Sequence, residues 1–504
     1  MSTPRPYYLT TAIDYANGDP HLGHALEKIG ADVIARWHRL QGLPVHFVMG
    51  MDEHGQKVYQ AATADGGTPA AWLDRIAERF ESTWRGLGCS HDDWIRTTQP
   101  RHAAAVTALI ERIRAHHPDH LSEGEYEGLY CVGCEEFKQE SQIVDGRCSE
   151  HPSRELVVTR ERNTFFRLSA WQDRLLDLIE SGTFRVEPAI RRNEILSVLR
   201  AGLQDISISR ARLPWGIPFP GGADETVYVW FDALINYLTA TGYPTGDWER
   251  LWPADLHVVG KGITRFHCII WPAMLLAADL PLPRQVWAHG YVQWGGTKVS
   301  KSEGVAVSLE DATHRHGPDA LRWFLVREVG FEADGDFSFE RFDARYASDL
   351  ADGLGNLASR VTAMLVKYRE GAVASGTART ALDDAGDALV AEYVAAMSAI
   401  DLRGAAAAIE RLVTEADGFV STSAPWTLAK GDDPAALDEV LAALARVLQR
   451  LAVMTAPIMP GKAEALWTAL GQQGTPHAAW ARAEAPSMDG ARVRKPENLF
   501  PRQT

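Results

Sequence analysis

Two histidines, His21 and His24, stand where the sequence passes from a predicted strand into a predicted helix. The run "YYLTTAI" before them is typical of a buried strand, and after Gly23 apolar residues recur every three or four positions, as on one helix face. The first N–H groups of a helix and the positive end of its dipole attract anions. The pair therefore indicates either an anion-binding site or, more simply, solvent-exposed loop histidines.

A second group of residues has the spacing of a metal site. The segment "CVGCEEFKQESQIVDGRCSEH" contains a Cys-x2-Cys pair, thirteen residues, and a Cys-x2-His pair; the four side chains are Cys131, Cys134, Cys148 and His151. Each pair lets one turn present two ligands, and zinc prefers such sulfur-rich tetrahedral sets. Because protein would fill all four positions, we predict a structural zinc ion, with four unrelated residues as the alternative. Cys89 and Cys268 lie outside this set and are predicted to be buried small apolar residues.

The elements around the histidines predict a parallel sheet. The helix after Gly23 leads into a second apolar strand, "GLPVHFVMGMDEHG", and Asp52 stands at its carboxyl end. Strand, helix and strand at this spacing form a βαβ unit, and ligands bind beyond the carboxyl ends of such strands. We therefore expect His21, His24 and Asp52 to share one crevice. The chain has neither G-x-G-x-x-G nor a Walker A loop, so the usual dinucleotide and P-loop sites are excluded.

The strand–helix rhythm stops near residue 116 and returns after residue 225 with "LHVVGKG", an apolar helix and the strand "QVWAHGYVQ". A glycine-flanked loop, "GGTKVSKSEG", follows. From about residue 345 the chain is rich in alanine, and the apolar positions 350, 354, 357, 361, 364, 365 and 368 make a helical stripe.

Composition sets the broad class. The chain has 504 residues, five cysteines and a net charge of −15, which argues mildly against nonspecific coating of nucleic acid. No apolar run is long enough for a membrane span, and no secretory signal is recognisable, so we expect a cytoplasmic protein with no membrane partner.

The predicted parallel sheet and its two motifs, "HLGH" and "KVSKS", resemble those of a class I aminoacyl-tRNA synthetase. That family carries a HIGH motif and a KMSKS motif at these places. The finer resemblance is to the methionyl-tRNA synthetases. It rests on collinear motifs over essentially the whole chain: "YANGDPHLGH", "DEHG", the single zinc knuckle, "AGLQDISISR", "TVYVWFDALINYL", "RFHCIIWPAML", "HGYV", "GNLASR" and "APWTLAK".

The resemblance implies an α/β Rossmann-like catalytic domain split by an inserted zinc-binding lobe and followed by an all-α anticodon-binding bundle. The expected boundaries are 1–115 for the first catalytic half with "HLGH", 116–225 for the inserted lobe, 226–290 for the second catalytic half, 291–345 for the KVSKS loop and stem-contact region, and 346–504 for the helical domain with its C-terminal tail.

The resemblance also implies an activity: methionine and ATP, with Mg²⁺, give methionyl-adenylate and pyrophosphate, and the methionyl group then passes to the terminal adenosine of methionine tRNA, elongator and initiator. The expected catalytic residues are His21, His24, Lys298 and Lys301. The expected ATP contacts are His21, Gly23, His24, Glu27, Arg210, Val292, Lys298 and Lys301. The expected methionine contacts are Ile13, Tyr15, Asp52, Trp230, Tyr237 and His267.

On composition alone, core packing is the commoner role for Trp230 and Tyr237, seven positions apart on one predicted helix, and Asp52 could be a cap or a surface ion pair. The expected anticodon contacts are Asn356, Arg360 and Trp426. Asn356 and Arg360 are four apart and flank the buried stripe, and an exposed Trp426 could stack on a base. Without the resemblance, a solvated Asn and Arg and a core Trp would be the better interpretation. We expect a monomer.

Three positions depart from the family pattern: Val299 replaces methionine, Asp14 stands where many relatives have proline, and Gly262 replaces a carboxylate. Gly262 supports an alternative, a paralogue that does not charge tRNA. A synthetase for another amino acid is the second alternative.

Overall fold

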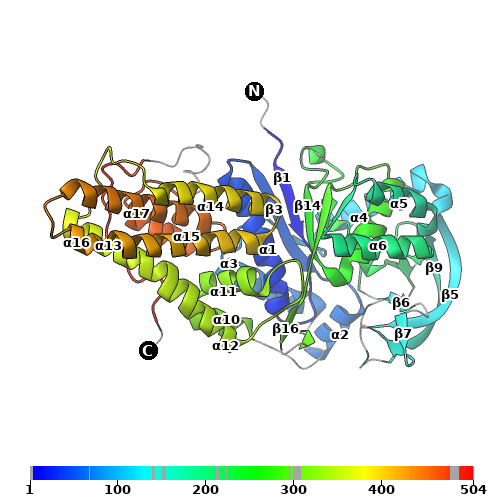
Figure 1. Cartoon of the computed structure of the whole chain (residues 1–504). Helices are drawn as coiled ribbons and strands as arrows, with labels where there is room; N and C mark the ends of the chain where they lie inside the picture. The colour runs from blue at the N-terminus through cyan, green and yellow to red at the C-terminus, as the bar shows by residue number, and fades with distance from the viewer. Residues whose placement is uncertain are drawn as a thin grey trace. The chain divides into compact units, whose positions relative to one another are not determined.

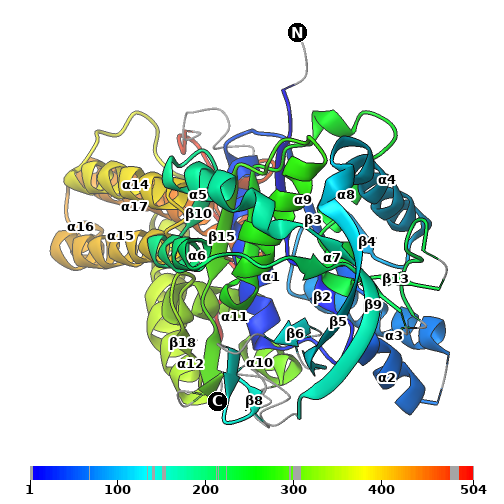
Figure 2. The same ribbon diagram turned by 90° about the vertical axis from the view of Figure 1, so that its right-hand side faces the viewer.

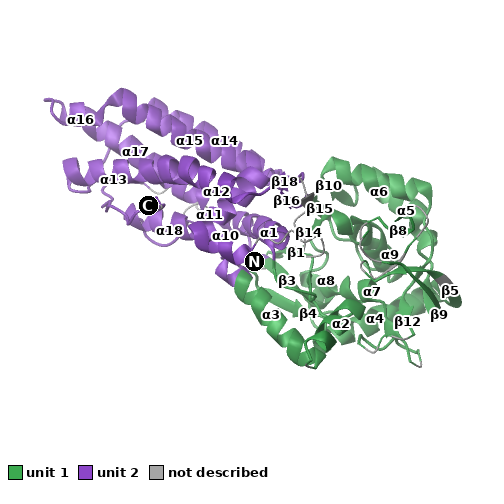
Figure 3. Ribbon diagram, turned by 90° about the horizontal axis from the view of Figure 1, so that it is seen from below, with its two compact units in different colours: residues 1–20, 46–83, 91–289 green, residues 21–45, 84–90, 290–504 purple. Residues whose placement is uncertain are grey.

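The computed structural model describes residues 4–66, 68–132, 134, 136–138, 142–149, 152, 155–211, 213, 215–222, 224–294, 297–298, 308–476 and 487–502. The chain folds into two compact units (Figure 3), each assembled from segments far apart in sequence. Unit 1 contains residues 1–20, 46–83 and 91–289, and unit 2 contains residues 21–45, 84–90 and 290–504. Among the described residues, no helix has the length and apolar character needed to cross a membrane.

A seven-stranded sheet forms the centre of unit 1. Its strand order is β10–β15–β14–β1–β3–β2, and β4 pairs with β3 off this path. The strands are β1 (Tyr7–Thr11), β2 (Asp14–Tyr15), β3 (Val45–Asp52), β4 (Asp93–Arg96), β10 (Arg185–Glu187), β14 (Leu256–Gly260) and β15 (Gln285–His289). The ladders β1–β14, β14–β15, β10–β15, β2–β3 and β3–β4 are parallel, which confirms the predicted α/β class.

Apolar helices bury this sheet. The helices of unit 1 include α2 (Gln56–Ala64), α4 (Pro100–His116), α5 (Gln172–Glu180), α6 (Ala189–Ala201), α7 (Val229–Ala233), α8 (Asn236–Thr239) and α9 (Trp271–Ala277), and α3 (Pro69–Gly86) runs from unit 1 into unit 2. One core joins strand residues such as Tyr8, Val48 and Ile95 to Leu109 of α4 and Met274 of α9. The sheet therefore has a rigid apolar support on which the ends of its strands can hold polar side chains.

The lobe inserted into unit 1 is antiparallel. Strands β5 (Leu121–Cys131) and β9 (Val157–Phe166) pair along their whole length, and Figure 2 shows them as two long curved ribbons. With β6 (Glu136–Lys138) and β11 (Ile206–Ser207) they form a four-stranded sheet, and β7 (Ile143–Val144) and β8 (Arg147–Cys148) form a small separate pair. Strands β12 (Ser209–Arg210) and β13 (Thr226–Val227) form a further two-stranded antiparallel pair.

Unit 2 begins with α1 (Leu22–Leu40), the amphipathic helix expected after the histidines. A three-stranded sheet follows in the order β17–β16–β18, from Thr297–Lys298, Val292–Trp294 and Gly335–Asp336. Helices α10 (Leu309–His316), α11 (Pro318–Phe324) and α12 (Phe339–Arg345) lead into a π-helical segment, Tyr346–Gly355.

The rest of unit 2 is a helical bundle (Figure 1), with α13 (Asn356–Arg369), α14 (Ala381–Ser398), α15 (Leu402–Ser423), α16 (Pro425–Leu428), α17 (Pro434–Thr455) and α18 (Pro460–Ala469). Side-chain caps start its long helices: Thr380 and Asp383 form a capping box on α14, and Asp401 accepts from the Gly404 N–H at 2.7 Å on α15. Five positions of the predicted stripe, Leu350, Leu354, Leu357, Val361 and Leu365, are buried, whereas Met364 and Tyr368 are only half-buried.

Two local expectations were wrong. The run "QVWAHGYVQ" is not one strand, because β15 ends at His289 and β16 begins at Val292 in another sheet. A Cβ at Gly290 would lie 2.2 Å from the Ala333 carbonyl carbon, so only glycine fits where the chain leaves the first sheet. Likewise, Trp230 and Tyr237 do not share one helix, since α7 ends at Ala233 and α8 begins at Asn236.

Candidate functional site

The two histidines cap the first turn of α1. His21 is the N-cap residue, and its Nδ1 accepts from the N–H groups of Gly23 and His24 at 3.1 and 3.4 Å. His24 Nδ1 accepts in return from the His21 N–H at 3.3 Å, and the two rings stack with centroids 3.7 Å apart. A ring nitrogen that accepts a main-chain N–H carries no proton, so the neutral form of each ring is protonated at Nε2. Each imidazole thus has an Nε2–H donor, beside the positive end of a helix.

Gly23 makes this cap possible. A Cβ at position 23 would lie 3.0 Å from His21 Cε1 and 3.1 Å from Nδ1, closer than side chains normally approach. The glycine therefore makes room for the His21 ring, a reason that the sequence did not reveal.

Two further residues of unit 2 that are expected near ATP, Glu27 and Val292, are buried. Glu27 is 7% exposed, one turn into α1, and its carboxylate lies 2.8 Å from Nζ of the fully buried Lys28. Val292 is buried in β16, where the neighbouring Gln293 pairs with Lys298 of β17. Lys301 lies outside the described residues.

In unit 1, Asp52 and Tyr15 lie opposite each other at the end of the β2–β3 ladder. Asp52 is only 6% exposed and accepts from the His54 N–H at 3.4 Å, so it is not a surface ion pair. Ile13, Tyr15 and Trp230 are partly buried against the core of the unit. The core of the unit that contains Asp52 therefore also supports these three side chains.

Tyr237 and His267 form a buried pair. The Tyr237 hydroxyl lies 2.6 Å from His267 Nε2, and His267 Nδ1 lies 2.9 Å from the Ile263 carbonyl oxygen. Because a carbonyl can only accept, His267 donates from Nδ1 and accepts the tyrosine proton at Nε2. The ring centroid of His257 lies 4.3 Å from that of Tyr237, and burial lowers the pKa of His257 well below its ordinary value.

Trp230 contacts both the cysteine segment and the residue next to His267. Its ring stacks on Phe266 with centroids 3.8 Å apart, and its Nε1–H donates to the Cys134 carbonyl at 3.3 Å. Phe266 is a residue that sequence reasoning missed, although it immediately precedes His267.

Cys131, Cys134 and Cys148 come together as a metal site requires. Their sulfur atoms all lie within 4.8 Å of one another, and Cys134 Sγ is 3.5 Å from Cys148 Sγ. Zn–S bonds of about 2.3 Å in a tetrahedron place sulfur atoms about 3.8 Å apart, so the three thiols fit a zinc ion. His151 lies outside the described residues. Cys89 and Cys268 are buried and apart from this cluster, as predicted.

Arg210 is fixed between aromatic rings. Its guanidinium carbon lies 4.2 Å from the Tyr228 ring centre, and Nη1 donates to the Ser207 hydroxyl and the Ser209 carbonyl at 2.9 and 2.8 Å. The cation is therefore pre-oriented, although only 8% of the residue is exposed.

The expected anticodon residues lie at the surface of unit 2. Asn356 is exposed in the first turn of α13, and Arg360 Nη1 lies 3.0 Å from Asp417 Oδ1. Trp426 is 43% exposed on α16, so it is not a core residue.

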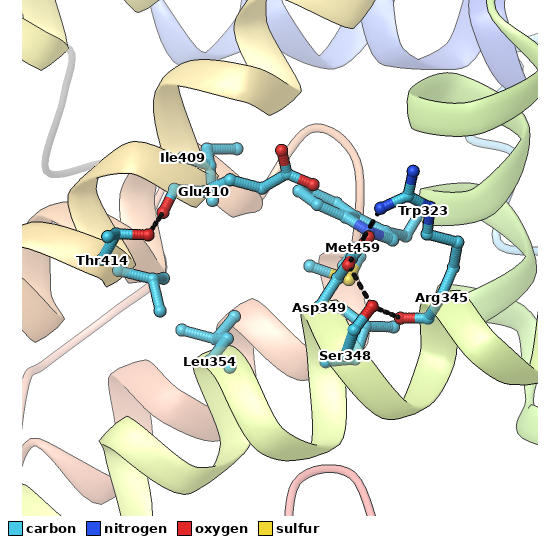
Figure 4. Close-up of a pocket in the computed structure, with 12 residues that line it drawn as sticks. Trp323, Arg345, Ser348, Asp349, Leu354, Ile409, Glu410, Thr414 and Met459 are labelled. Carbon is cyan, nitrogen blue, oxygen red and sulfur yellow. Dashed lines mark hydrogen bonds and ion pairs between the residues drawn. The ribbon is translucent and has the colours of Figure 1, made fainter. Parts of the chain in front are cut away.

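A cavity of about 270 Å³ lies within the helical part of unit 2 (Figure 4). Leu350, Leu354, Ile409, Val413 and Met459 form much of its apolar wall. Asp349 also lines it, and accepts from Trp323 Nε1 at 3.3 Å and from the Ser348 hydroxyl at 2.6 Å. Among the described residues, none of the predicted catalytic, substrate-binding or metal-binding residues lines this cavity, so it is separate from the candidate site.

The departures from the family pattern differ in their surroundings. Asp14 is 3% exposed in β2 and pairs with Met51 of β3. Gly262 is exposed in the short 3₁₀ turn Lys261–Ile263 after β14. Val299 lies outside the described residues.

Sequence reasoning also missed a buried polar cluster of His54, His102 and Asp232 in unit 1. The available signal was Asp232 itself, a carboxylate inside the apolar run "VYVWFDALINYL". A buried charge at such a position needs a partner.

Comparison with known proteins gives whole-chain matches. Residues 7–157 and 152–362 match the family described as tRNA synthetases class I (M), and residues 370–504 match the anticodon binding domain of methionyl tRNA ligase. The methionine–tRNA ligase of Streptomyces coelicolor is 41% identical, over 99% of this chain and 97% of that protein. The methionine–tRNA ligase of Brucella suis is also 41% identical, over 98% of each chain. A solved structure of Mycobacterium tuberculosis methionyl-tRNA synthetase in complex with methionyl-adenylate superposes with a TM-score of 0.94 at 38% identity, and covers 99% of this chain and 100% of that one.

Proposed function

This chain belongs to the methionyl-tRNA synthetase family of class I, and from that premise we propose that it activates L-methionine with ATP and transfers the methionyl group to methionine tRNA. The observation that carries the proposal is the extent of the likeness, since the two family models together match residues 7–362 and 370–504. The catalytic and the anticodon-reading parts of such an enzyme are therefore both represented.

We assign the phosphate side of the site to the start of α1. The Nε2–H groups of His21 and His24 would donate to phosphate oxygens, and the helix dipole would stabilise the negative charge that develops there. Lys298 and Lys301 would hold the departing pyrophosphate. Mg²⁺ bound with ATP would neutralise phosphate charge. The remaining assigned ATP contacts are Gly23, Glu27, Arg210 and Val292.

We assign the amino-acid side to the carboxyl end of β3. Asp52 would pair with the methionine ammonium, and the apolar, polarizable surroundings would suit a thioether. The methionine contacts that we assign are Ile13, Tyr15, Asp52, Trp230, Tyr237 and His267. The buried hydrogen bond between Tyr237 and His267 supports a fixed wall there rather than an adaptable one.

The two proposed steps need little covalent chemistry from the protein. A methionine carboxylate oxygen attacks the α-phosphorus of ATP, and the bond from that phosphorus to the bridging β-phosphate oxygen breaks to release pyrophosphate. A ribose hydroxyl of the terminal tRNA adenosine then attacks the methionyl carbonyl carbon, and AMP leaves. The protein contributes positioning, charge stabilisation and exclusion of water.

We propose one structural zinc ion held by Cys131, Cys134, Cys148 and His151. Zinc bound by four protein ligands keeps no position for water, so it would stabilise the lobe rather than react. Metal analysis of the purified protein tests this: about one equivalent of zinc supports the site. Less than half an equivalent, with folding unaffected by a chelator, contradicts it.

For tRNA recognition we assign Asn356, Arg360 and Trp426 to the anticodon, with Trp426 as a stacking surface for an unpaired base. We further propose a cytoplasmic monomer that acts on elongator and initiator methionine tRNA. The domain boundaries proposed from the sequence are 1–115, 116–225, 226–290, 291–345 and 346–504.

Amino-acid-dependent exchange of pyrophosphate into ATP tests the activation step. We expect exchange with methionine and far less with the other nineteen amino acids. Exchange with a different amino acid would show a synthetase of other specificity. If no amino acid supports exchange, Gly262 and Val299 mark a chain that has lost activation.

A further inference from the structure

The carboxylate of Asp232 is fully buried between two imidazoles from distant parts of unit 1. His54 Nδ1 lies 2.7 Å from its Oδ2, and His102 Nε2 lies 2.7 Å from its Oδ1. Burial would raise the pKa of this carboxyl, but His54 and His102 hold the pKa below its ordinary value. Asp232 is therefore ionised inside the core, and the loss of either imidazole would remove a partner from a buried charge.

One arm of this network reaches the segment that carries Asp52. The main-chain N–H of His54 donates to the Asp52 carboxylate at 3.4 Å, while its side chain donates to Asp232. Between them, Glu53 is fixed independently, because its carboxylate lies 2.7 Å from Arg96 Nε. The segment after β3 is thus anchored at two successive side chains, which leaves the Asp52 carboxylate little freedom.

The other arm reaches the helices that carry the aromatic residues. Asp232 lies two positions after Trp230 in α7. His102, on α4, has its Nδ1 2.8 Å from the Thr239 hydroxyl in α8, the short helix that contains Tyr237. Three assigned methionine contacts are therefore each connected to one buried carboxylate.

We propose that Asp232 is a positioning residue of the amino-acid site, which through His54 and His102 holds Asp52, Trp230 and Tyr237 in one arrangement ready for the ammonium and side chain of the substrate. This inference rests on the proposed function. Asp232 itself touches neither substrate. Its contribution is preorganisation, because the polar and apolar side chains of the site keep their relative positions before the substrate binds.

The arrangement predicts a selective kinetic defect. In Asp232→Asn one of the two carboxylate acceptors becomes an N–H donor, so one imidazole loses its charged acceptor and must change tautomer to bond the amide, which weakens that arm. We expect the methionine KM in pyrophosphate exchange to rise about tenfold or more, the usual cost of a lost hydrogen bond to a charged group. The ATP KM should stay within about twofold, because the assigned phosphate donors lie on other elements.

Two variants of His54 distinguish positioning from bulk stability. An asparagine amide can place an N–H near the position of His Nδ1, so His54→Asn should keep the methionine KM within about threefold of wild type. His54→Ala removes the donor and should behave like Asp232→Asn. The matched control is Asp255→Asn, which alters a partly buried carboxylate of unit 1, held by the Tyr8 N–H at 2.8 Å and by Arg5 at 3.1 Å. It should leave both KM values near wild type.

The outcomes separate the two claims. If the wild-type chain exchanges pyrophosphate with methionine, the proposed function stands. The positioning role is then overturned if Asp232→Asn and His54→Ala raise the methionine KM and the ATP KM equally, or if their KM values match those of Asp255→Asn. If the wild-type chain shows no methionine-dependent exchange, the proposed function fails and this inference falls with it. A rise confined to the methionine KM, restored in His54→Asn, supports it.

Discussion

Arg322 and Asp32 are both fully buried in unit 2, and Nη2 of the arginine lies 2.7 Å from a carboxylate oxygen of the aspartate. The same guanidinium donates to the carbonyl oxygen of Leu87. It also donates to the carbonyl oxygens of Pro457 and Ile458, which lie in the turn between α17 and α18. Asp32 belongs to α1, the helix that His21 caps. Through the ion pair and these carbonyl contacts, Arg322 joins the helix with the proposed phosphate donors to the bundle that carries the proposed anticodon surface.

We expect Arg322→Met to lower the free energy of unfolding by about 3–5 kcal/mol, because it leaves a buried carboxylate with one cation fewer and several carbonyls without a donor. Equilibrium urea unfolding measures the loss. The control is Arg411→Met, whose pair with Glu392 is more than half exposed on both sides and should contribute under about 1 kcal/mol. Equal losses of unfolding free energy in the two variants would show that the buried pair stabilises the fold no more than an exposed pair does.

The same pair should make unit 2 sensitive to acid. Burial would raise the pKa of Asp32, but Arg322 and Arg36 overcome this and lower the pKa to about 2. A depressed folded-state pKa means that the stabilisation is complete above the unfolded pKa of about 4 and disappears as the pH falls through 2. The difference in unfolding free energy between wild type and Asp32→Asn should therefore shrink by about 2 kcal/mol between pH 6 and pH 2. A difference independent of pH would mean that the Asp32 charge is not what stabilises the fold.

Gly23→Ala should slow adenylate formation about tenfold to a hundredfold. The new Cβ would lie 3.0 Å from His21 Cε1, so the ring must shift by a few tenths of an ångström and its Nε2–H must move with it. Loss of a transition-state donor usually costs about 100- to 1,000-fold, and displacement should cost less. Single-turnover adenylation measures the rate.

The matched control for this variant is Gly418→Ala, at an exposed position of α15 where a Cβ would meet nothing within 4 Å. It should leave the rate unchanged and stabilise the helix by up to about 1 kcal/mol. If Gly23→Ala reacts as fast as Gly418→Ala, the capping geometry of His21 has no part in adenylation.

Much of this site follows from local sequence signals. Helical spacing after Gly23 predicted α1 and its start, and the cysteine spacing predicted the cluster of Cys131, Cys134 and Cys148. Each of these patterns depends on residues within about twenty positions, where periodicity and turn geometry decide the structure.

The parts that could not be predicted depend on contacts distant in sequence. Asp232 meets His54 and His102 across 178 and 130 positions, and no local pattern indicates such partners. Similarly, the break at Gly290 arises from the close approach of the Ala333 main chain. The sequence indicated candidate site residues, whereas the buried polar groups that lie beside them appear only in the fold.

Trp426→Ala should separate the two activities. Loss of a stacking surface costs about 1–3 kcal/mol per base, so charging at limiting tRNA should fall about tenfold while pyrophosphate exchange, which needs no tRNA, stays at the wild-type rate. Leu43→Ala is the control, since Leu43 is 44% exposed in the same unit and Trp426 is 43% exposed. Parallel loss of both activities in Trp426→Ala would mean that the residue supports the fold rather than the anticodon.

The central claim, that this chain charges methionine tRNA, is tested most directly by aminoacylation with the purified protein, ATP, Mg²⁺, L-methionine and methionine tRNA. We predict a methionyl ester on the terminal adenosine, formed with a CAU anticodon and strongly reduced when that anticodon is changed. Methionine-dependent pyrophosphate exchange without any charged tRNA, or the esterification of a different amino acid, would contradict the account.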